Sequence, residues 1–261
     1  MSVFNSSTQP TRNYLDFLQA MTEKELKARY KNTLFGFLWI LVNPLLQMIV
    51  IGFIFRLFIK EPIENYFLYL FAGLLVWNFF SLSLTKATPS IVNERSLIKK
   101  ANFPRSVIPL SIVLSNFVQL VLAYLLFLIP VIYLGTLSNL WILESIFGFI
   151  FLLSFTAGIG LLTSALNVRF RDINFFVQAI LILWFYATPI VYSVFVVPRN
   201  LIWLWRINPL TSVVQLFQKA LSEAPGPGPA MLLTNSIIII FVIVIGYSIF
   251  YKESKNFDDW V

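Results

Sequence analysis

The sequence contains no cysteine and no histidine among its 261 residues. The missing cysteines exclude disulfides, thiolate metal sites and thiol nucleophiles, and the missing histidines exclude imidazole catalysis and histidine-ligated metals. Charge is also scarce, because Asp, Glu, Lys and Arg make up only 12% of the chain while apolar residues make up 58%. A soluble fold could not cover so much apolar surface. We therefore predict an integral membrane protein without a separate soluble domain.

Long uncharged runs predict one all-α transmembrane domain that spans residues 1–261 and crosses the bilayer six times. About 20 residues cross the hydrocarbon core as a helix. The uncharged run over residues 106–143 is long enough for two spans, with a turn at Leu134, Gly135 and Thr136. Glycines at 148, 158 and 160 give the fourth span small residues for close packing. We expect spans at about residues 33–57, 66–86, 107–133, 141–167, 173–192 and 231–251.

Two further segments are amphipathic rather than spanning. Over residues 14–30, Tyr14, Leu15, Phe17 and Met21 gather on one side, which predicts an interfacial helix on the inner membrane surface. An ordinary polar lead-in to the first span is the alternative. Residues 196–221 hold two short segments broken at Asn208, which favours a re-entrant helix pair dipping in from the outer face. A simple surface helix is the alternative there.

The segment over residues 86–105 is polar and basic, and it separates two apolar runs. Its five cations face one acid, Glu94, so the positive-inside rule places it in the cytoplasm together with both termini. Residues 91–100 can form a short helix after Pro89, with Ser90 or Asn93 as its cap and Pro104 beyond its end. Such a helix could transmit force into the membrane, or the segment could be a charged loop that only fixes topology. The net charge of +7 lies in such loops and implies no nucleic acid.

Catalytic patterns are missing from the sequence. It contains no GxxxxGK[ST] loop for ATP, and the only acid near a span is Glu144. A proton-coupled carrier usually needs acids or histidines inside the membrane. Because the spans of this chain offer almost none, we expect the energy for its function to come from another source. A five-residue turn between the fourth and fifth spans carries Arg169, Arg171 and Asp172. The arginines place this turn on the inner side, and Asp172 could cap the next helix.

Aromatic residues make up 17% of the chain, and several have polar neighbours inside the spans. Aromatic faces beside hydroxyl and amide groups suit sugar rings, whose C–H faces are apolar, although core packing and lipid contact are the plainer interpretation. The rings that we consider for a glycan channel are Trp77, Phe79, Phe80, Tyr124, Trp184, Tyr186 and Tyr192.

Four blocks of sequence resemble, in the same order, those of the type-two exporter permeases of the ABC superfamily, in the branch that exports polysaccharides and polyol phosphates. The blocks are RYKNTLFGFLWILVNPLL at residues 29–46, LNVRFRDI at 166–173, ATPIVYS at 187–193 and INPLTSVVQLFQKAL at 207–221. The resemblance implies six spans, the interfacial helix, the re-entrant pair and a homodimer that encloses a channel. It also implies two copies of a separate ATPase subunit, which would bind ATP and Mg, while this chain holds no cofactor.

The resemblance further implies roles for individual residues of a subunit in the inner membrane. The cargo would be a lipid-linked glycan such as an O-antigen, capsule or teichoic acid precursor, and it would thread past the aromatic rings. Arg169, Arg171 and Asp172 would form a second contact or an inner gate. Lys27, Arg29, Lys31 and Arg105 would attract the lipid pyrophosphate. The helix that enters the ATPase cleft would use Ile91, Asn93, Glu94, Arg95, Leu97, Ile98 and Lys99.

Two other functions stay open at this stage. A type-two exporter could instead move a lipid or a drug. A membrane glycosyltransferase or acyltransferase is the enzyme alternative, but it would need an acid or a histidine at the membrane face, and the sequence offers no such group.

Overall fold

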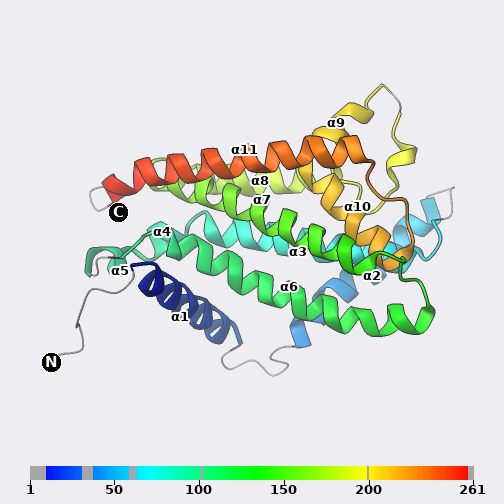
Figure 1. Cartoon of the computed structure of the whole chain (residues 1–261), viewed down its shortest axis with the longest axis horizontal. Coiled ribbons are helices and arrows are strands. Elements are labelled where there is room, and N and C mark those ends of the chain that lie inside the picture. The colour runs from blue at the N-terminus through cyan, green and yellow to red at the C-terminus, as the bar shows by residue number, and fades with distance from the viewer. Residues whose placement is uncertain (1–9, 31–37, 59–62, 101–102, 199, 258–261) are drawn as a thin grey trace.

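The structure is a computed structural model that describes residues 10–30, 38–58, 63–100, 103–198 and 200–257. These residues form an elongated bundle of helices (Figure 1). The longer helices are α1 (Pro10–Tyr30), α2 (Trp39–Phe58), α3 (Tyr66–Ala87), α6 (Val107–Leu134), α7 (Trp141–Arg169), α8 (Ile173–Tyr186), α10 (Pro209–Ser222) and α11 (Pro229–Glu253). The short ones are α4 (Ser90–Asn93), α5 (Arg95–Lys100), η2 (Val194–Val196), α9 (Ile202–Ile207) and η3 (Ser254–Asn256).

Helix α3 lies at the centre of the bundle and packs against α2, α6, α7, α8 and α10. Its side chains from Leu70 to Val76 are buried together with Phe79 and Phe80. The Phe71 ring stacks on Phe127 of α6 with ring centroids 4.0 Å apart, and the Phe80 ring stacks on Phe155 of α7 at 5.8 Å. The main hydrophobic core therefore surrounds α3.

Within the described residues, four helices are long and apolar enough to cross a membrane: α3, α6, α7 and α11. Helices α2 and α8 are apolar but shorter. The 14 residues of α8 rise only about 21 Å, against a hydrocarbon core of about 30 Å. The all-helical membrane architecture agrees with the sequence prediction. Of the six expected spans, four are helices long enough to cross a membrane within the described residues.

Helix α8 ends at Tyr186, six residues before the predicted end of the fifth span. Pro189 explains the early end, because proline lacks a backbone N–H and disfavours the helical conformation of the preceding Thr188. Side chains of other helices hold the chain beyond the break. The Tyr69 hydroxyl donates to the Tyr192 carbonyl at 2.9 Å, and Gln218 donates to the Pro189 carbonyl at 3.2 Å.

Helix α1 begins four residues earlier than predicted and runs beside the first half of α6 (Figure 1). The Tyr14 hydroxyl lies 3.3 Å from that of Ser106, and the Phe17 and Phe103 ring centroids are 4.8 Å apart. Met21 is buried on the same side of α1, while Leu15 is 61% exposed. Part of the apolar side of this helix therefore packs against the bundle, and Leu15 remains outside that contact.

The polar segment between α3 and α6 holds two short helices where one was predicted. Helices α4 and α5 are separated at Glu94, whose φ of −94° and ψ of 26° are not helical. Neither Ser90 nor Asn93 caps a helix there. Instead the Ser90 hydroxyl donates to the Ala87 carbonyl at 2.7 Å and closes the last turn of α3. We call this side of the bundle the α4–α5 end.

The opposite side, the α9–α10 end, contains the predicted turn between the third and fourth spans. Gly135 ends α6 with a left-handed φ of 68°, which a residue with a side chain rarely adopts. Just beyond it, Glu144 of α7 is buried and forms an ion pair with Lys219 of α10 at 2.7 Å. Thr136 donates to the Leu221 carbonyl at 3.0 Å. These contacts fix α10 against the turn.

Helices α9 and α10 meet at Asn208, where the sequence predicted a break. The Asn208 side chain accepts a bond from the Leu210 backbone N–H at 3.1 Å and so caps α10, while Pro209 occupies the first helical position. Asn208 also accepts a bond from Trp184 of α8 at 3.0 Å. Helix α10 is no surface helix, because Val213 and Phe217 are fully buried against the bundle. That alternative is therefore wrong.

Glycines on α7 allow close approach, but to three different neighbours rather than along one face. A Cβ on Gly148 would meet Phe217 of α10, and one on Gly160 would meet α3 and α6. The tightest approach lies between α7 and α11, where a Cβ on Gly246 would stand 2.2 Å from the Gly158 carbonyl oxygen. The backbones of α7 and α11 are thus nearly in contact.

We predict that Gly246→Ala pushes α11 away from α7 and destabilises the protein by about 1–3 kcal/mol, the usual cost of overpacking. The measurement is the thermal unfolding midpoint of the purified protein in detergent. Gly228→Ala serves as the matched control, because nothing lies within 4 Å of its added Cβ. Equal midpoints for the two variants would contradict the close α7–α11 approach.

Candidate functional site

The α4–α5 end is held together by a separate hydrophobic cluster. Ile91 of α4 and Ile98 of α5 are buried in it beside the first turn of α6 and the last turns of α7 and α11. Phe257, just after η3, is fully buried and makes an edge contact with Phe250 at 5.5 Å. The cluster consists of Ile91, Ile98, Ile108, Leu161, Ala165, Val168, Phe250 and Phe257. Force applied to α4 and α5 would therefore reach three long helices directly.

The predicted ATPase-contacting residues divide by exposure on these two helices. Asn93, Arg95 and Lys99 are exposed, Leu97 is half-buried, and the two isoleucines face the cluster. The helices thus present a polar surface outward and an apolar surface to the bundle. No contact with a second protein is needed to explain the buried side.

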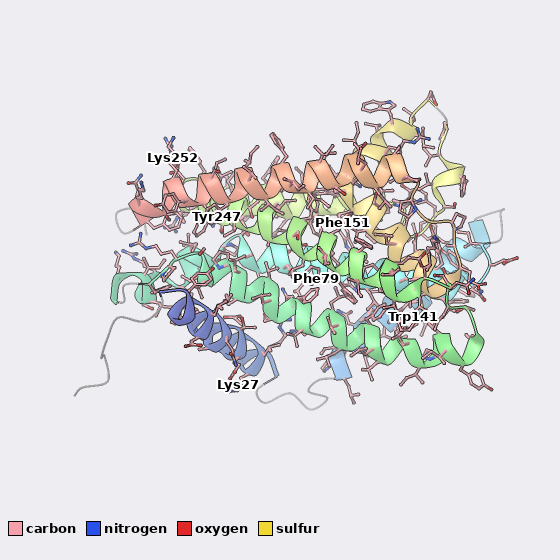
Figure 2. The ribbon with its side chains drawn as sticks, viewed as in Figure 1. Lys27, Phe79, Trp141, Phe151, Tyr247 and Lys252 are labelled. Carbon is pink, nitrogen blue, oxygen red and sulfur yellow. The ribbon has the colours of Figure 1, made fainter. Side chains whose placement is uncertain are left out.

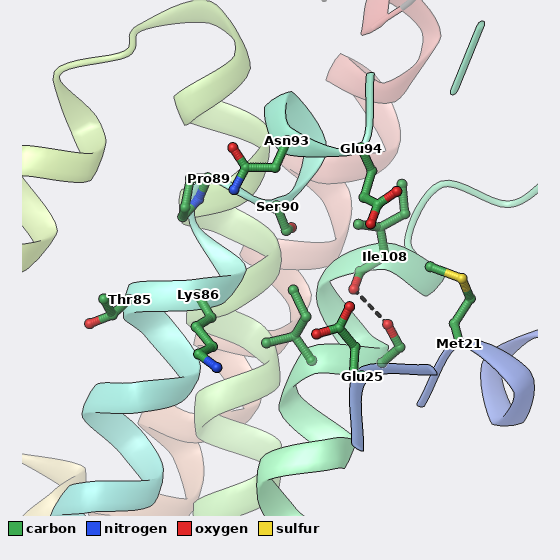
Figure 3. A pocket seen from close by; sticks show the side chains of 11 residues that line it. Met21, Glu25, Thr85, Lys86, Pro89, Ser90, Asn93, Glu94 and Ile108 are labelled. Carbon is green, nitrogen blue, oxygen red and sulfur yellow. Dashed lines mark hydrogen bonds between the residues drawn. The ribbon is translucent and has the colours of Figure 1, made fainter. Parts of the chain in front are cut away.

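Glu94 binds within the chain, at the junction of α4 and α5. The Lys24 ammonium of α1 donates to its carboxylate at 2.7 Å, which ties the amphipathic helix to the α4–α5 junction. Behind this ion pair, a cavity of 320 Å³ lies between α1, α3, α4 and α6. Figure 3 shows Glu25 and Lys86 around this cavity together with Glu94. Helix α1 is therefore a second element that any movement of α4 and α5 must involve.

The turn between α7 and α8 lies at the same end, because Val168 belongs to the cluster described above. Arg169, Arg171 and Asp172 are all exposed, and the Arg169 guanidinium lies 5.1 Å from the centre of the Phe170 ring. Asp172 occupies the cap position of α8, but its side chain accepts no capping bond, so the predicted cap is wrong. All three residues lie on the surface of this end.

Three of the four cations predicted to attract a pyrophosphate are described, and each has a local partner. Lys27 pairs with Glu23 at 3.2 Å and lowers the pKa of that carboxyl, and Figure 2 shows it pointing away from the bundle. Arg29 donates to Gln119 of α6, and Arg105 donates to the Ser254 carbonyl. Lys31 lies outside the described residues. The structure gives these side chains separate local partners and no shared site.

Three of the seven candidate channel rings belong to the core. Phe79, Phe80 and Tyr124 are at most 4% exposed, and Figure 2 shows Phe79 inside the bundle. Phe80 and Tyr124 pack inside one chain, whereas Phe79 also lines a cavity between α2, α3 and α6. Amphipathic spacing could not separate them from exposed rings, since α3 is apolar on nearly every side.

The other four rings reach the surface. Tyr186 is 60% exposed, and Trp77, Trp184 and Tyr192 are half-buried. Trp77 contacts Phe185 of α8 edge-on at 5.3 Å. The Tyr192 hydroxyl donates to the Tyr186 carbonyl at 2.7 Å and accepts a bond from Trp205 at 2.7 Å.

One strip of α3 is only partly covered, and polar side chains lie along and beside it; Asn78 of the strip donates to Gln47 of α2 at 3.0 Å. The strip contains Trp77, Asn78, Ser81, Leu82 and Thr85, spaced so that they share one side of the helix. The neighbouring α2 and α8 each expose an amide, Asn43 and Gln178 respectively. Sequence reasoning passed over these groups because it searched the spans for acids and histidines. Amides inside uncharged runs were the signal that would have found them.

Comparison with known proteins identifies the type of molecule. The family model of the ABC-2 type transporter matches residues 17–222, which is more than half of the chain. The chain belongs to the ABC-2 type transporter family. The matched region extends from α1 through α10 and so includes the α4–α5 end, the α7–α8 turn and the strip on α3.

Curated relatives carry one description. An O-antigen export system permease protein RfbA of Klebsiella pneumoniae is 40% identical over 76% of this chain and 77% of its own length. Another of the same name and organism is 35% identical over 93% of each chain. The RfbA of Myxococcus xanthus is 31% identical over 94% of this chain and 95% of its own.

Membership of the family decides between transport and catalysis. An ABC-2 family chain is a membrane transport component of an exporter, and catalysis is not its role. The glycosyltransferase and acyltransferase alternative is therefore excluded. ABC-2 permeases generally work with an ABC ATPase subunit, and the exposed polar side of α4 and α5 is a surface that such a subunit could contact.

We predict that Glu94→Lys loosens α1 from the α4–α5 junction, because it turns an attraction with Lys24 into a repulsion. For a partly exposed ion pair the expected loss is about 1 kcal/mol. Hydrogen exchange of residues 14–30 in the purified protein should speed up. The double reversal Lys24→Glu with Glu94→Lys should restore slow exchange, and a failure to restore it would show that the ion pair does not hold α1.

Proposed function

We propose that this chain is the channel-forming permease of an ATP-driven exporter that moves a lipid-linked polysaccharide of the O-antigen type across the cytoplasmic membrane. Family membership supplies the transport role, and the relatives named for O-antigen export suggest the cargo. The observation that carries the proposal is the polar strip on α3 between the apolar helices α2 and α8. A single chain leaves this strip partly uncovered.

The exposed amides support a homodimer. Asn43 and Gln178 are the fifth and sixth residues of α2 and α8, so both lie about 6–8 Å inside their helices. An amide that faces lipid lacks hydrogen-bond partners and is costly. A second copy placed against α2 and α8 would enclose these amides and the α3 strip in a shared polar passage. In that arrangement α2 and α8 would complete six spans per chain.

Two copies of a separate ATPase would bind at the α4–α5 end, which is then the cytoplasmic end. Arg95 and Lys99 would contact the ATPase, and Arg169 with Arg171 would supply a second contact or a gate. The ATPase subunits would hold ATP and Mg, and this chain would hold neither. Both termini would lie in the cytoplasm, since α1 and the last turn of α11 lie at that end (Figure 1).

The α9–α10 end would then face outward, with α9 and α10 as a re-entrant pair that closes the outer side of the passage. Trp184 binds the Asn208 junction of that pair, and Tyr192 binds Trp205 beside it. The exposed ring of Tyr186 lies next to this network. These rings would guide the glycan where it leaves the membrane.

The test of this function is export by the reconstituted complex. The chain and its ATPase partner, placed together in vesicles with lipid-linked glycan, should transfer glycan to the far side only when ATP is hydrolysed. Arg95→Ala with Lys99→Ala should leave both subunits inserted and folded but abolish glycan-stimulated hydrolysis. If the complex transports a drug or a plain phospholipid but no glycan, the proposed cargo is wrong.

We predict that Tyr186→Ala reduces glycan export without reducing the amount of inserted protein. A ring contact contributes about 0.5–1.5 kcal/mol, which corresponds to a two- to tenfold weaker interaction with the cargo. Export should be measured as glycan per inserted permease. Tyr133→Ala is the matched control, because Tyr133 is 90% exposed at the end of α6, away from α8. Equal effects would show that Tyr186 does not meet the cargo.

A further inference from the structure

A cavity inside the membrane-spanning part of the protein carries an inference about the cargo. It lies between α2, α3 and α6 and has a volume of 110 Å³. Four amide side chains line it, and among the described residues no charged side chain does. The amides are Asn43, Asn78, Asn116 and Gln119, and apolar side chains including Phe79 and Leu75 form the rest of the wall.

Two of these amides are buried and only half satisfied. Asn116 is 2% exposed and donates to the Ser83 hydroxyl at 3.0 Å, but its carbonyl oxygen accepts no hydrogen bond in the described part of the chain. Gln119 is 8% exposed and accepts a bond from Arg29, but its NH₂ group donates to no described residue. Buried amide groups nearly always have hydrogen-bond partners, so a partner is expected for each of these two atoms.

The unpartnered atoms of the two residues differ in kind. Asn116 and Gln119 are three residues apart on α6 and therefore share one side of the helix. One offers an acceptor and the other a donor. A hydroxyl group both donates and accepts, so a ligand that carries hydroxyls satisfies both atoms at once.

The rest of the wall narrows the class of ligand. The described lining carries no charged side chain, and the Arg29 guanidinium beside it is bonded to Gln119, which favours a neutral ligand over a phosphate or an ammonium group. Apolar and aromatic surface beside a few polar groups suits a ligand with both C–H and hydroxyl edges, and a sugar ring has both. The small volume accommodates the edge of one sugar unit and excludes a longer segment of a chain.

We infer that this cavity is a subsite for one neutral sugar unit of the exported glycan, held by Asn43, Asn78, Asn116 and Gln119. The inference rests on the proposed function, because it needs a glycan as the cargo. It goes beyond that function by placing a specific sugar contact on α6, away from the aromatic rings of α8. The side chain of Asn43 is exposed and marks where the sugar enters.

The test is photo-crosslinking in cells that make the lipid-linked glycan. A benzophenone amino acid at Asn43 should capture glycan, detected as a ladder on the permease by an anti-glycan antibody. The same amino acid at Ile49 is the matched control, because Ile49 is 56% exposed on the same helix but does not line the cavity. Capture should disappear in cells that make no glycan.

A second variant tests the donor itself. Gln119→Glu keeps an acceptor for Arg29 and removes the NH₂ group that faces the cavity, so capture at Asn43 should fall about tenfold, as expected for loss of one hydrogen bond. Gln19→Glu adds the same charge on the exposed side of α1 and should leave capture unchanged. Should Gln119→Glu fail to insert, capture at Asn43 against Ile49 decides alone.

The outcomes separate this inference from the proposed function. Capture at Asn43 that Gln119→Glu weakens supports the subsite. Active export without capture at Asn43, together with capture at Tyr186, overturns the subsite, leaves the exporter intact and means that the cavity holds only water. Absence of glycan export by the complex overturns both.

Discussion

The burial of α3 is the constraint on which the remaining structure depends. Five helices cover it, and rings such as Phe71 and Phe80 fill the space around it. The strip from Trp77 to Thr85 stays partly open. Because that strip carries amide and hydroxyl groups, neither lipid nor a buried apolar neighbour suits it. A polar passage shared between chains satisfies it, and this requirement links the fold to transport.

Movement at the α4–α5 end has a defined route into the bundle. Ile91 and Ile98 pack into a cluster with the ends of α6, α7 and α11, while Glu94 holds Lys24 of α1. A rigid displacement of α4 and α5 would therefore carry the amphipathic helix and three long helices together. Packed side chains transmit such a shift without large local changes, since well-packed interiors resist compression. The exposed polar side of the two helices leaves a surface for the driving subunit.

Sequence patterns predicted the positions of the long helices well, because runs without charge leave a membrane helix as the only stable choice. The predictions failed where a single residue ends a helix or where a neighbouring helix determines which side chains are buried. Pro189 ended α8 early, and Glu94 divided the predicted coupling helix in two. The core positions of Phe80 and Tyr124 could not be predicted, because an almost uniformly apolar span gives no sign of which side faces protein. Partners on other helices, such as Gln119 for Arg29, could not be predicted either.

The amide side chains in the membrane part of the protein differ in whether their hydrogen bonds are satisfied. Amides without a partner indicate a binding function more clearly than amides that are fully bonded within the fold. Asn208 is fully used by Trp184, Thr188 and Leu210, and it serves the fold. Asn116 and Gln119 are more deeply buried than Asn208, but each keeps one atom without a described partner. In an apolar medium such an atom destabilises the protein by about 1–3 kcal/mol unless something binds it. A transporter that must hold a polar cargo briefly and release it needs groups of this second kind.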